Sequence, residues 1–72
     1  MVNNDKIFAY CKETIEDFDL QYEVALKRID HCRCPLRMVD SYFYAQIERA
    51  IEDWCIDNDV NVEDVDIEEI FG

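Results

Sequence analysis

The sequence predicts an all-α fold, a small helical bundle, from three observations. Glycine occurs once, as the final residue, and proline occurs once, whereas sheets and loop-rich folds need turn residues at many positions. Half of the residues are apolar, which is unlike the composition of a disordered chain. The apolar residues recur at intervals of three or four, the period of an amphipathic helix. We therefore expect long helices joined by few connections.

Length and composition also limit the organisation of the chain. Seventy-two residues correspond to one domain, near the lower limit at which a single core is stable, so residues 1–72 are predicted to form a single helical domain. The first ten residues contain no apolar run long enough for a signal peptide, and no stretch of the sequence could span a bilayer. These features indicate a cytoplasmic protein whose four cysteines are reduced thiols.

The first helical pattern begins after Asn3 or Asn4, either of which is suited to cap a helix. Its apolar stripe consists of Ile7, Cys11, Ile15, Phe18, Tyr22, Ala25 and Ile29. The stripe keeps its phase throughout, so we favour one long helix over residues 4–32. The alternative is a break near Asp19, which gives two shorter helices and leaves acidic side chains at a helix C-terminus, where the helix dipole disfavours them.

A second long helix is predicted after the proline. Residues 34–35, Cys-Pro, end the first pattern because the residue before proline avoids helical angles and proline cannot join the hydrogen-bond ladder. The next helix begins between residues 36 and 41, with Asp40 as its cap, and runs to about Asp57. Its main apolar face consists of Phe43, Ile47, Ala50, Ile51 and Trp54, flanked by Tyr44 and Cys55.

This second helix also carries a thinner apolar stripe on its opposite side. Its members are Met38, Tyr42, Ala45 and Ile56. A helix that is apolar on two sides usually touches two neighbours, so this stripe predicts a contact with the chain's own tail or with a second copy in a homodimer. The corresponding alternative function is a helical dimerisation or adaptor module.

Residues 57–61, Asp-Asn-Asp-Val-Asn, are typical of a turn. The apolar residues that follow predict a short C-terminal helix, about residues 62–70, that packs back on the bundle. Acidic side chains at Glu63, Asp64 and Asp66 suit its N-terminal turns.

The charge of the chain is concentrated in its second half. The net charge is −11, and from residue 41 onward there are ten acidic residues and a single base, Arg49. Such a surface repels nucleic acid and membranes, which are polyanions, and attracts basic proteins. We expect the partner-binding residues to be Asp53, Asp57, Asp59, Glu63, Asp64, Asp66, Glu68 and Glu69. A small opposing cluster of bases surrounds the proline turn: Lys27, Arg28, Arg33 and Arg37.

The acidic residues suggest a specific kind of partner. Carboxylates three or four residues apart on a helix lie about 5–6 Å apart, close to the spacing of about 6–7 Å between phosphates on one DNA strand. The hypothesis is an inhibitor that occupies the basic, nucleic-acid-binding surface of another protein. In small size, acidity and lack of catalytic groups the chain resembles phage-encoded inhibitors of bacterial defence, such as anti-CRISPR and anti-restriction proteins, which implies a host-cell cytoplasmic location.

Two segments resemble metal-binding patterns, and neither is predicted to bind a metal. His31, Cys32 and Cys34 offer zinc two or three ligands, so that Cys11 or Cys55 would have to complete the site. Residues 57–68 match much of an EF-hand calcium loop, but its sixth position, which needs glycine, is valine, and its normally apolar eighth position is aspartate. The expectation is that no metal or cofactor is used.

Catalysis is also not expected. The chain has one histidine and no internal glycine, and loops that cradle phosphates need glycine for close backbone approach. His31 and Cys32 are adjacent, so on a helix their side chains point about 100° apart and make a poor nucleophile–base pair. The sequence therefore predicts a binding protein and not an enzyme.

Overall fold

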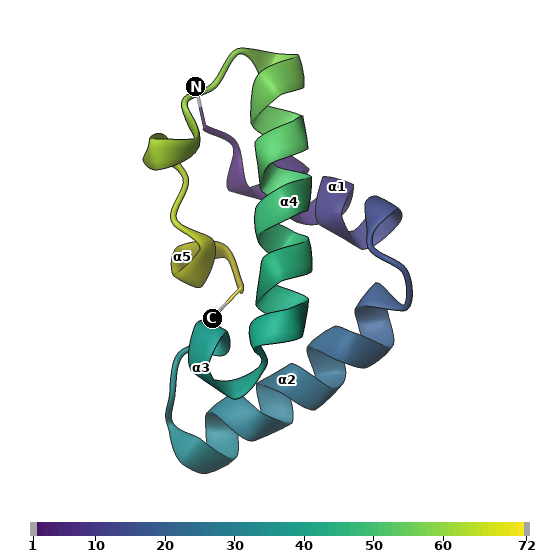
Figure 1. Cartoon of the computed structure of the whole chain (residues 1–72), viewed down its shortest axis with the longest axis vertical. Coiled ribbons are helices and arrows are strands. Elements are labelled where there is room, and N and C mark those ends of the chain that lie inside the picture. Colours follow the sequence, from purple (N-terminus) through teal and green to yellow (C-terminus); the bar gives the residue numbers. More distant parts are fainter. Residues whose placement is uncertain (1, 72) are drawn as a thin grey trace.

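A central helix organises the structure, a computed structural model that describes residues 2–71 (Figure 1). Within these residues it contains helices and no strand: α1 (Asn4–Thr14), α2 (Phe18–Cys32), α3 (Leu36–Val39), α4 (Ser41–Asn58), the 3-10 helix η1 (Val62–Asp64) and α5 (Ile67–Phe71). α1 packs across α4, α2 passes near the start of α4, and η1 and α5 lie along its other side. The predicted all-α fold is confirmed. No helix of the described part is long and apolar enough to cross a membrane.

The favoured single helix over residues 4–32 is wrong, and the alternative of two helices is correct. α1 ends at Thr14, the next residue, Ile15, is extended (φ −88°, ψ 123°), and Asp17 adopts a left-handed conformation with φ 54° before α2 begins. A straight helix over residues 4–32 would be about 43 Å long, which exceeds the longest dimension of the described molecule, 36 Å. The bend lets both Ile15 and Phe18 reach the core, where they are 8% and 3% exposed. Aspartate tolerates the left-handed region better than most residues.

The predicted helix boundaries around the proline are confirmed. α2 ends at Cys32, and the N–H of the left-handed Arg33 donates to the carbonyl oxygen of Ile29. After the single turn of α3, the Asp40 side chain accepts a hydrogen bond from the Phe43 N–H at 3.0 Å and caps α4. α4 continues to Asn58, one residue beyond the predicted end.

The core lies between α4 and the helices that cross it. The predicted main face of α4 is confirmed, because Phe43, Ile47, Ala50, Ile51 and Trp54 are all buried. An aromatic cluster fills the space between α1, α2, α4 and α5. Its members are Phe8, Phe18, Tyr22, Phe43 and Phe71. Their ring centroids lie 5.2–6.2 Å apart, the range in which aromatic pairs add to the effect of area burial.

The tail does not form the single helix predicted over residues 62–70. Val65 is extended (φ −99°, ψ 126°) and separates η1 from α5. The Asp66 carboxylate accepts hydrogen bonds from the N–H groups of Glu68 and Glu69, at 3.1 and 3.4 Å, and so starts a new helix. Aspartate favours such caps over helix interiors because its short side chain competes for nearby N–H groups. We call residues 60–71 the terminal segment.

Candidate acidic binding surface

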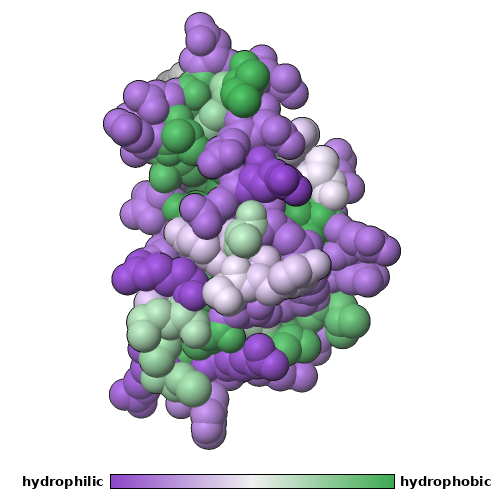
Figure 2. All heavy atoms as spheres, in the orientation of Figure 1, coloured by the Kyte–Doolittle hydropathy of each residue, from purple (hydrophilic) through white to green (hydrophobic). Residues whose placement is uncertain are grey.

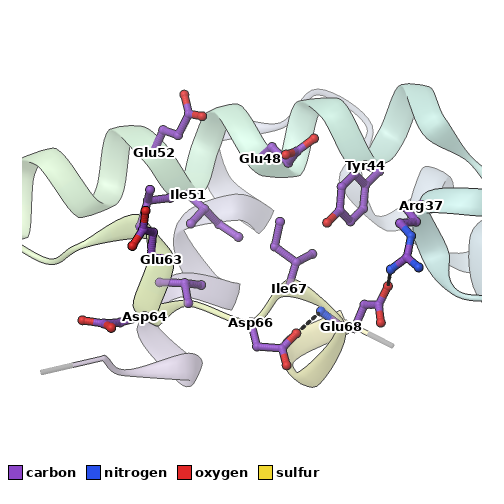
Figure 3. A pocket seen from close by; sticks show the side chains of 12 residues that line it. Arg37, Tyr44, Glu48, Ile51, Glu52, Glu63, Asp64, Asp66, Ile67 and Glu68 are labelled. Atoms are coloured by element: carbon purple, nitrogen blue, oxygen red, sulfur yellow. Dashed lines mark hydrogen bonds and ion pairs between the residues drawn. The ribbon is translucent and has the colours of Figure 1, made fainter.

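A groove of about 500 Å³ separates α4 from the terminal segment (Figure 3). Six carboxylates line this acidic groove: Glu48, Glu52, Glu63, Asp64, Asp66 and Glu68. Ile51 and Ile67 lie between the two walls, whereas the Glu52 and Asp64 side chains are directed outward from the rim. The groove is therefore apolar where its walls meet and negative along its edges.

Helix geometry and one ion pair position these side chains. Glu48 and Glu52 are one turn apart, so they share the flank of α4 that faces the terminal segment. Glu63 and Asp64 belong to η1. The Arg37 guanidinium extends from α3 on the opposite side of the groove from η1 and pairs with Glu68. Among the described residues, Arg37 is the only base that lines the groove.

A second hollow, of about 440 Å³, lies on the other side of the terminal segment, against the start of α1. Its acidic residues are Asp5, Asp64, Asp66 and Glu69, so Asp64 and Asp66 belong to both hollows. The two hollows together make one acidic surface that runs over both sides of the terminal segment.

The pKa of the Tyr44 hydroxyl reflects the electrostatic potential inside the acidic groove. Partial burial, followed by the negative charges of Glu48, Glu68 and Asp66, raises the pKa of Tyr44 above its usual 10.0, and Arg37 is the group that lowers it. The carboxylates therefore make the potential at this hydroxyl negative despite the nearby guanidinium. A cation entering the groove would be stabilised by the same field.

The structure brings together five of the eight predicted partner-binding residues. Glu63, Asp64, Asp66, Glu68 and Glu69 line one or both hollows. Of the other three, Asp53 lies beside Arg49 on a different flank of α4. Asp57 and Asp59 are exposed at the C-terminal end of α4.

Three acidic residues of this surface were missed by the sequence analysis. Glu48 and Glu52 were detectable in principle, because they flank Ile51 on a helix whose buried face was correctly predicted. Asp5 carried no such signal. Its position near Asp64 depends on the terminal segment folding back against α1, which is a contact between the two ends of the described chain.

The four residues of the predicted second stripe are exposed. Met38 is 69%, Tyr42 75% and Ile56 78% exposed, and Ala45 is exposed as well. The terminal segment packs on another flank of α4 and does not line a hollow with them. Tyr42 and Ile56 are separated by about 21 Å along the helix axis, and hydrophobic atoms on the face drawn in Figure 2 form patches divided by hydrophilic ones.

The metal-binding patterns are not assembled. Cys11 and Cys55 are buried in the core, whereas Cys32 is exposed and Cys34 half-buried. Burial raises the pKa of Cys11 to about 12, which keeps this thiol protonated. Asp57, the first residue of the calcium-loop pattern, is still inside α4. Across residues 2–71, no three His, Cys, Asp or Glu side chains are grouped so as to hold a metal ion.

No protein-family model, curated protein or solved structure matches this chain.

Proposed function

We propose that this protein is a non-enzymatic binding protein that occludes a basic, nucleic-acid-binding surface of a partner protein. The observation that carries the proposal is the acidic groove, which is lined by carboxylates from α4, η1 and the start of α5, with Arg37 as the one base among the described residues that line it. A phage-encoded inhibitor of the anti-CRISPR or anti-restriction type is the kind of protein that works in this way.

The physical basis is charge complementarity. Lysine and arginine side chains that normally hold phosphates would form charge-assisted hydrogen bonds with the carboxylates and release the anions bound to them. Glu48 and Glu52, one helical turn apart, are spaced about 5–6 Å, similar to consecutive phosphates. The contact would weaken steeply as salt is added, because exposed charges are screened over about 10 Å at 0.1 M ionic strength.

The test compares two variants with the same net charge. The first, E48Q/E52Q/E63Q/D64N, removes four of the six carboxylates of the acidic groove and leaves the Asp66 cap and the Arg37–Glu68 pair intact. The second, E13Q/E16Q/E23Q/D30N, removes the same number of charges from exposed positions on or beside α1 and α2. Immobilised protein is used to capture nucleic-acid-binding proteins from a bacterial lysate at low salt, and the captured protein is then titrated with labelled DNA or RNA.

The proposal expects the wild type and the second variant to displace the nucleic acid and the groove variant to fail. Displacement by both variants alike would show that the groove is only a solvated surface. Simultaneous binding of the nucleic acid and this protein to the partner would also reject the proposal.

A second candidate function is self-association or adaptor binding through exposed apolar residues. The exposure of Met38, Tyr42 and Ile56 favours it. Such a contact would be tolerant of salt, because burial of apolar surface does not depend on charge. Sedimentation at micromolar concentration should then give a dimer that Y42D/I56D converts to a folded monomer. A wild-type monomer would exclude the homodimer.

A further inference from the structure

Few hydrogen bonds connect the terminal segment to the rest of the molecule. Most of its hydrogen bonds are internal, such as the Asp64 N–H to the Asn61 carbonyl oxygen (2.9 Å) and the Val65 N–H to the Val62 carbonyl oxygen (3.1 Å). Two described side-chain bonds join it to other helices, one from the Tyr22 hydroxyl and one from Arg37. A segment whose turns satisfy themselves can leave the body of the protein without breaking many hydrogen bonds.

Apolar side chains hold the terminal segment against the core, and the most deeply buried of them is Phe71. Phe71 is 2% exposed, stacks on Phe8 with a centroid distance of 5.2 Å, and meets Phe18 and Tyr22 edge-on. The Tyr22 hydroxyl donates to the Phe71 carbonyl oxygen at 3.0 Å. At the opposite end of the segment, the Val60 N–H donates to the carbonyl oxygen of Cys55 at 2.9 Å and continues directly from the end of α4. Docking therefore depends on Phe71 at the far end together with the partly buried Val60, Val65, Ile67 and Ile70 along the segment.

Repulsion acts between these two ends. Glu48 and Glu52 on α4 line the acidic groove together with Glu63, Asp64, Asp66 and Glu68 of the terminal segment. On the other side, Asp5 on α1 faces the segment's carboxylates. Among residues 2–71, the Arg37–Glu68 pair is the one ion pair that joins this segment to the rest of the molecule. Docking brings like charges together, so its free energy depends on how well those charges are screened.

We infer that the terminal segment is a strap whose closure is controlled by neutralisation of the carboxylates on both sides of it. Cations close the strap over Ile51 and the aromatic cluster, and low ionic strength favours opening while α1, α2 and α4 stay folded. The inference concerns the fold itself and does not depend on the proposed binding function.

Native-state hydrogen exchange on the full chain tests this inference. The amide of Ile70 donates to the Asp66 carbonyl oxygen inside α5. It reports on the strap, because a helix of five residues is not stable in water once it leaves the body of the protein. The amide of Ile51, inside α4, reports on global unfolding. The amide of Ile70 should exchange faster than the amide of Ile51. The ratio of the Ile70 exchange rate to the Ile51 exchange rate should fall as NaCl is raised from about 0.01 M to about 1 M, because the Debye length shrinks from about 30 Å to about 3 Å.

A matched pair of variants separates strap repulsion from net charge. E48Q/E52Q removes two charges from the groove wall, whereas E13Q/E16Q removes two from exposed positions at the end of α1 and in the bend after it. At low salt the first should slow the exchange of Ile70 relative to Ile51 roughly two- to tenfold, as two or more surface charge interactions allow. The second should leave the ratio unchanged. Three results would each overturn the inference. They are equal effects of the two variants, an exchange ratio that does not change with salt, and exchange of Ile70 at the same rate as Ile51.

Discussion

The cap of α4 provides a sharp test of how local chemistry stabilises this fold. α4 is 18 residues long and supplies the largest share of the buried core. Its first N–H groups have no partner inside the helix, and the Asp40 side chain satisfies one of them through the 3.0 Å bond from Phe43. Replacing Asp40 by alanine removes both this hydrogen bond and a negative charge at the positive end of the helix dipole.

The size of the effect follows from these two contributions. Loss of an N-cap costs about 1 kcal/mol, and loss of the charge–dipole interaction costs about 0.3–1 kcal/mol. For the chain of 72 residues, the total free energy of unfolding is about 4–11 kcal/mol, so D40A should remove a substantial fraction of it. The corresponding fall in Tm is about 5–16 °C, at 4–8 °C per kcal/mol for a domain of this size.

D40N is the matched control, because asparagine caps helices about as well as aspartate but carries no charge. Urea and thermal unfolding, followed by far-UV circular dichroism, should rank the wild type first, D40N second and D40A third. Both variants remove the same negative charge from a strongly acidic chain, so the difference between D40N and D40A isolates the hydrogen bond. If D40A and D40N unfold at the same denaturant concentration, the cap contributes nothing and the reasoning fails.

Three further outcomes follow from burial. I47A should lower the free energy of unfolding by about 2–5 kcal/mol, whereas I56A should lower it by less than about 0.5 kcal/mol. The reason is that Ile47 is 0% exposed and Ile56 is 78% exposed on the same helix. Equal losses of the two variants in urea unfolding would contradict this packing. The raised pKa of Cys11 means that the folded state binds its proton more tightly than the unfolded state, so stability is fully present below the unfolded pKa of about 9 and is lost as pH rises toward 12. Between pH 9 and 11 the wild type should therefore lose up to about 1.4 kcal/mol per pH unit more than C11A, and identical pH profiles would refute this. In the native protein a thiol reagent should modify Cys32 and Cys34 first, with Cys11 reacting only on unfolding, which peptide mapping by mass spectrometry can check.

Several elements were predictable because their signals are local. The proline at residue 35 ends the first helical region whatever surrounds it, since its ring and missing N–H act on the backbone directly. Asp40 caps α4 through a bond to a residue three positions away. The buried face of α4 followed from the 3.6-residue period alone, and Phe43, Ile47 and Ile51 are nearly inaccessible.

The bend after α1 was not predictable in the same way. Ile15 and Phe18 are three residues apart, so an apolar stripe through them keeps helical phase whether the chain is straight or bent. What decides the matter is that both side chains are buried in a molecule only 36 Å in its longest dimension. The break at Val65 was not predictable for a similar reason. Asp66 can lie inside a helix or cap a new one, and in this structure it is a cap.

The sequence by itself determined that the chain is helical, where its longest helix begins, which face of that helix is buried and that most of its negative charge follows residue 41. Only the tertiary structure decided which carboxylates meet. Charges near one another in sequence, such as Asp53 and Glu52, lie on different flanks of α4, whereas Asp5 and Glu69 share one hollow. The physical reason is that the terminal segment is held by an aromatic contact between Phe71 and Phe8, and long-range packing of this kind leaves no periodic trace in the sequence.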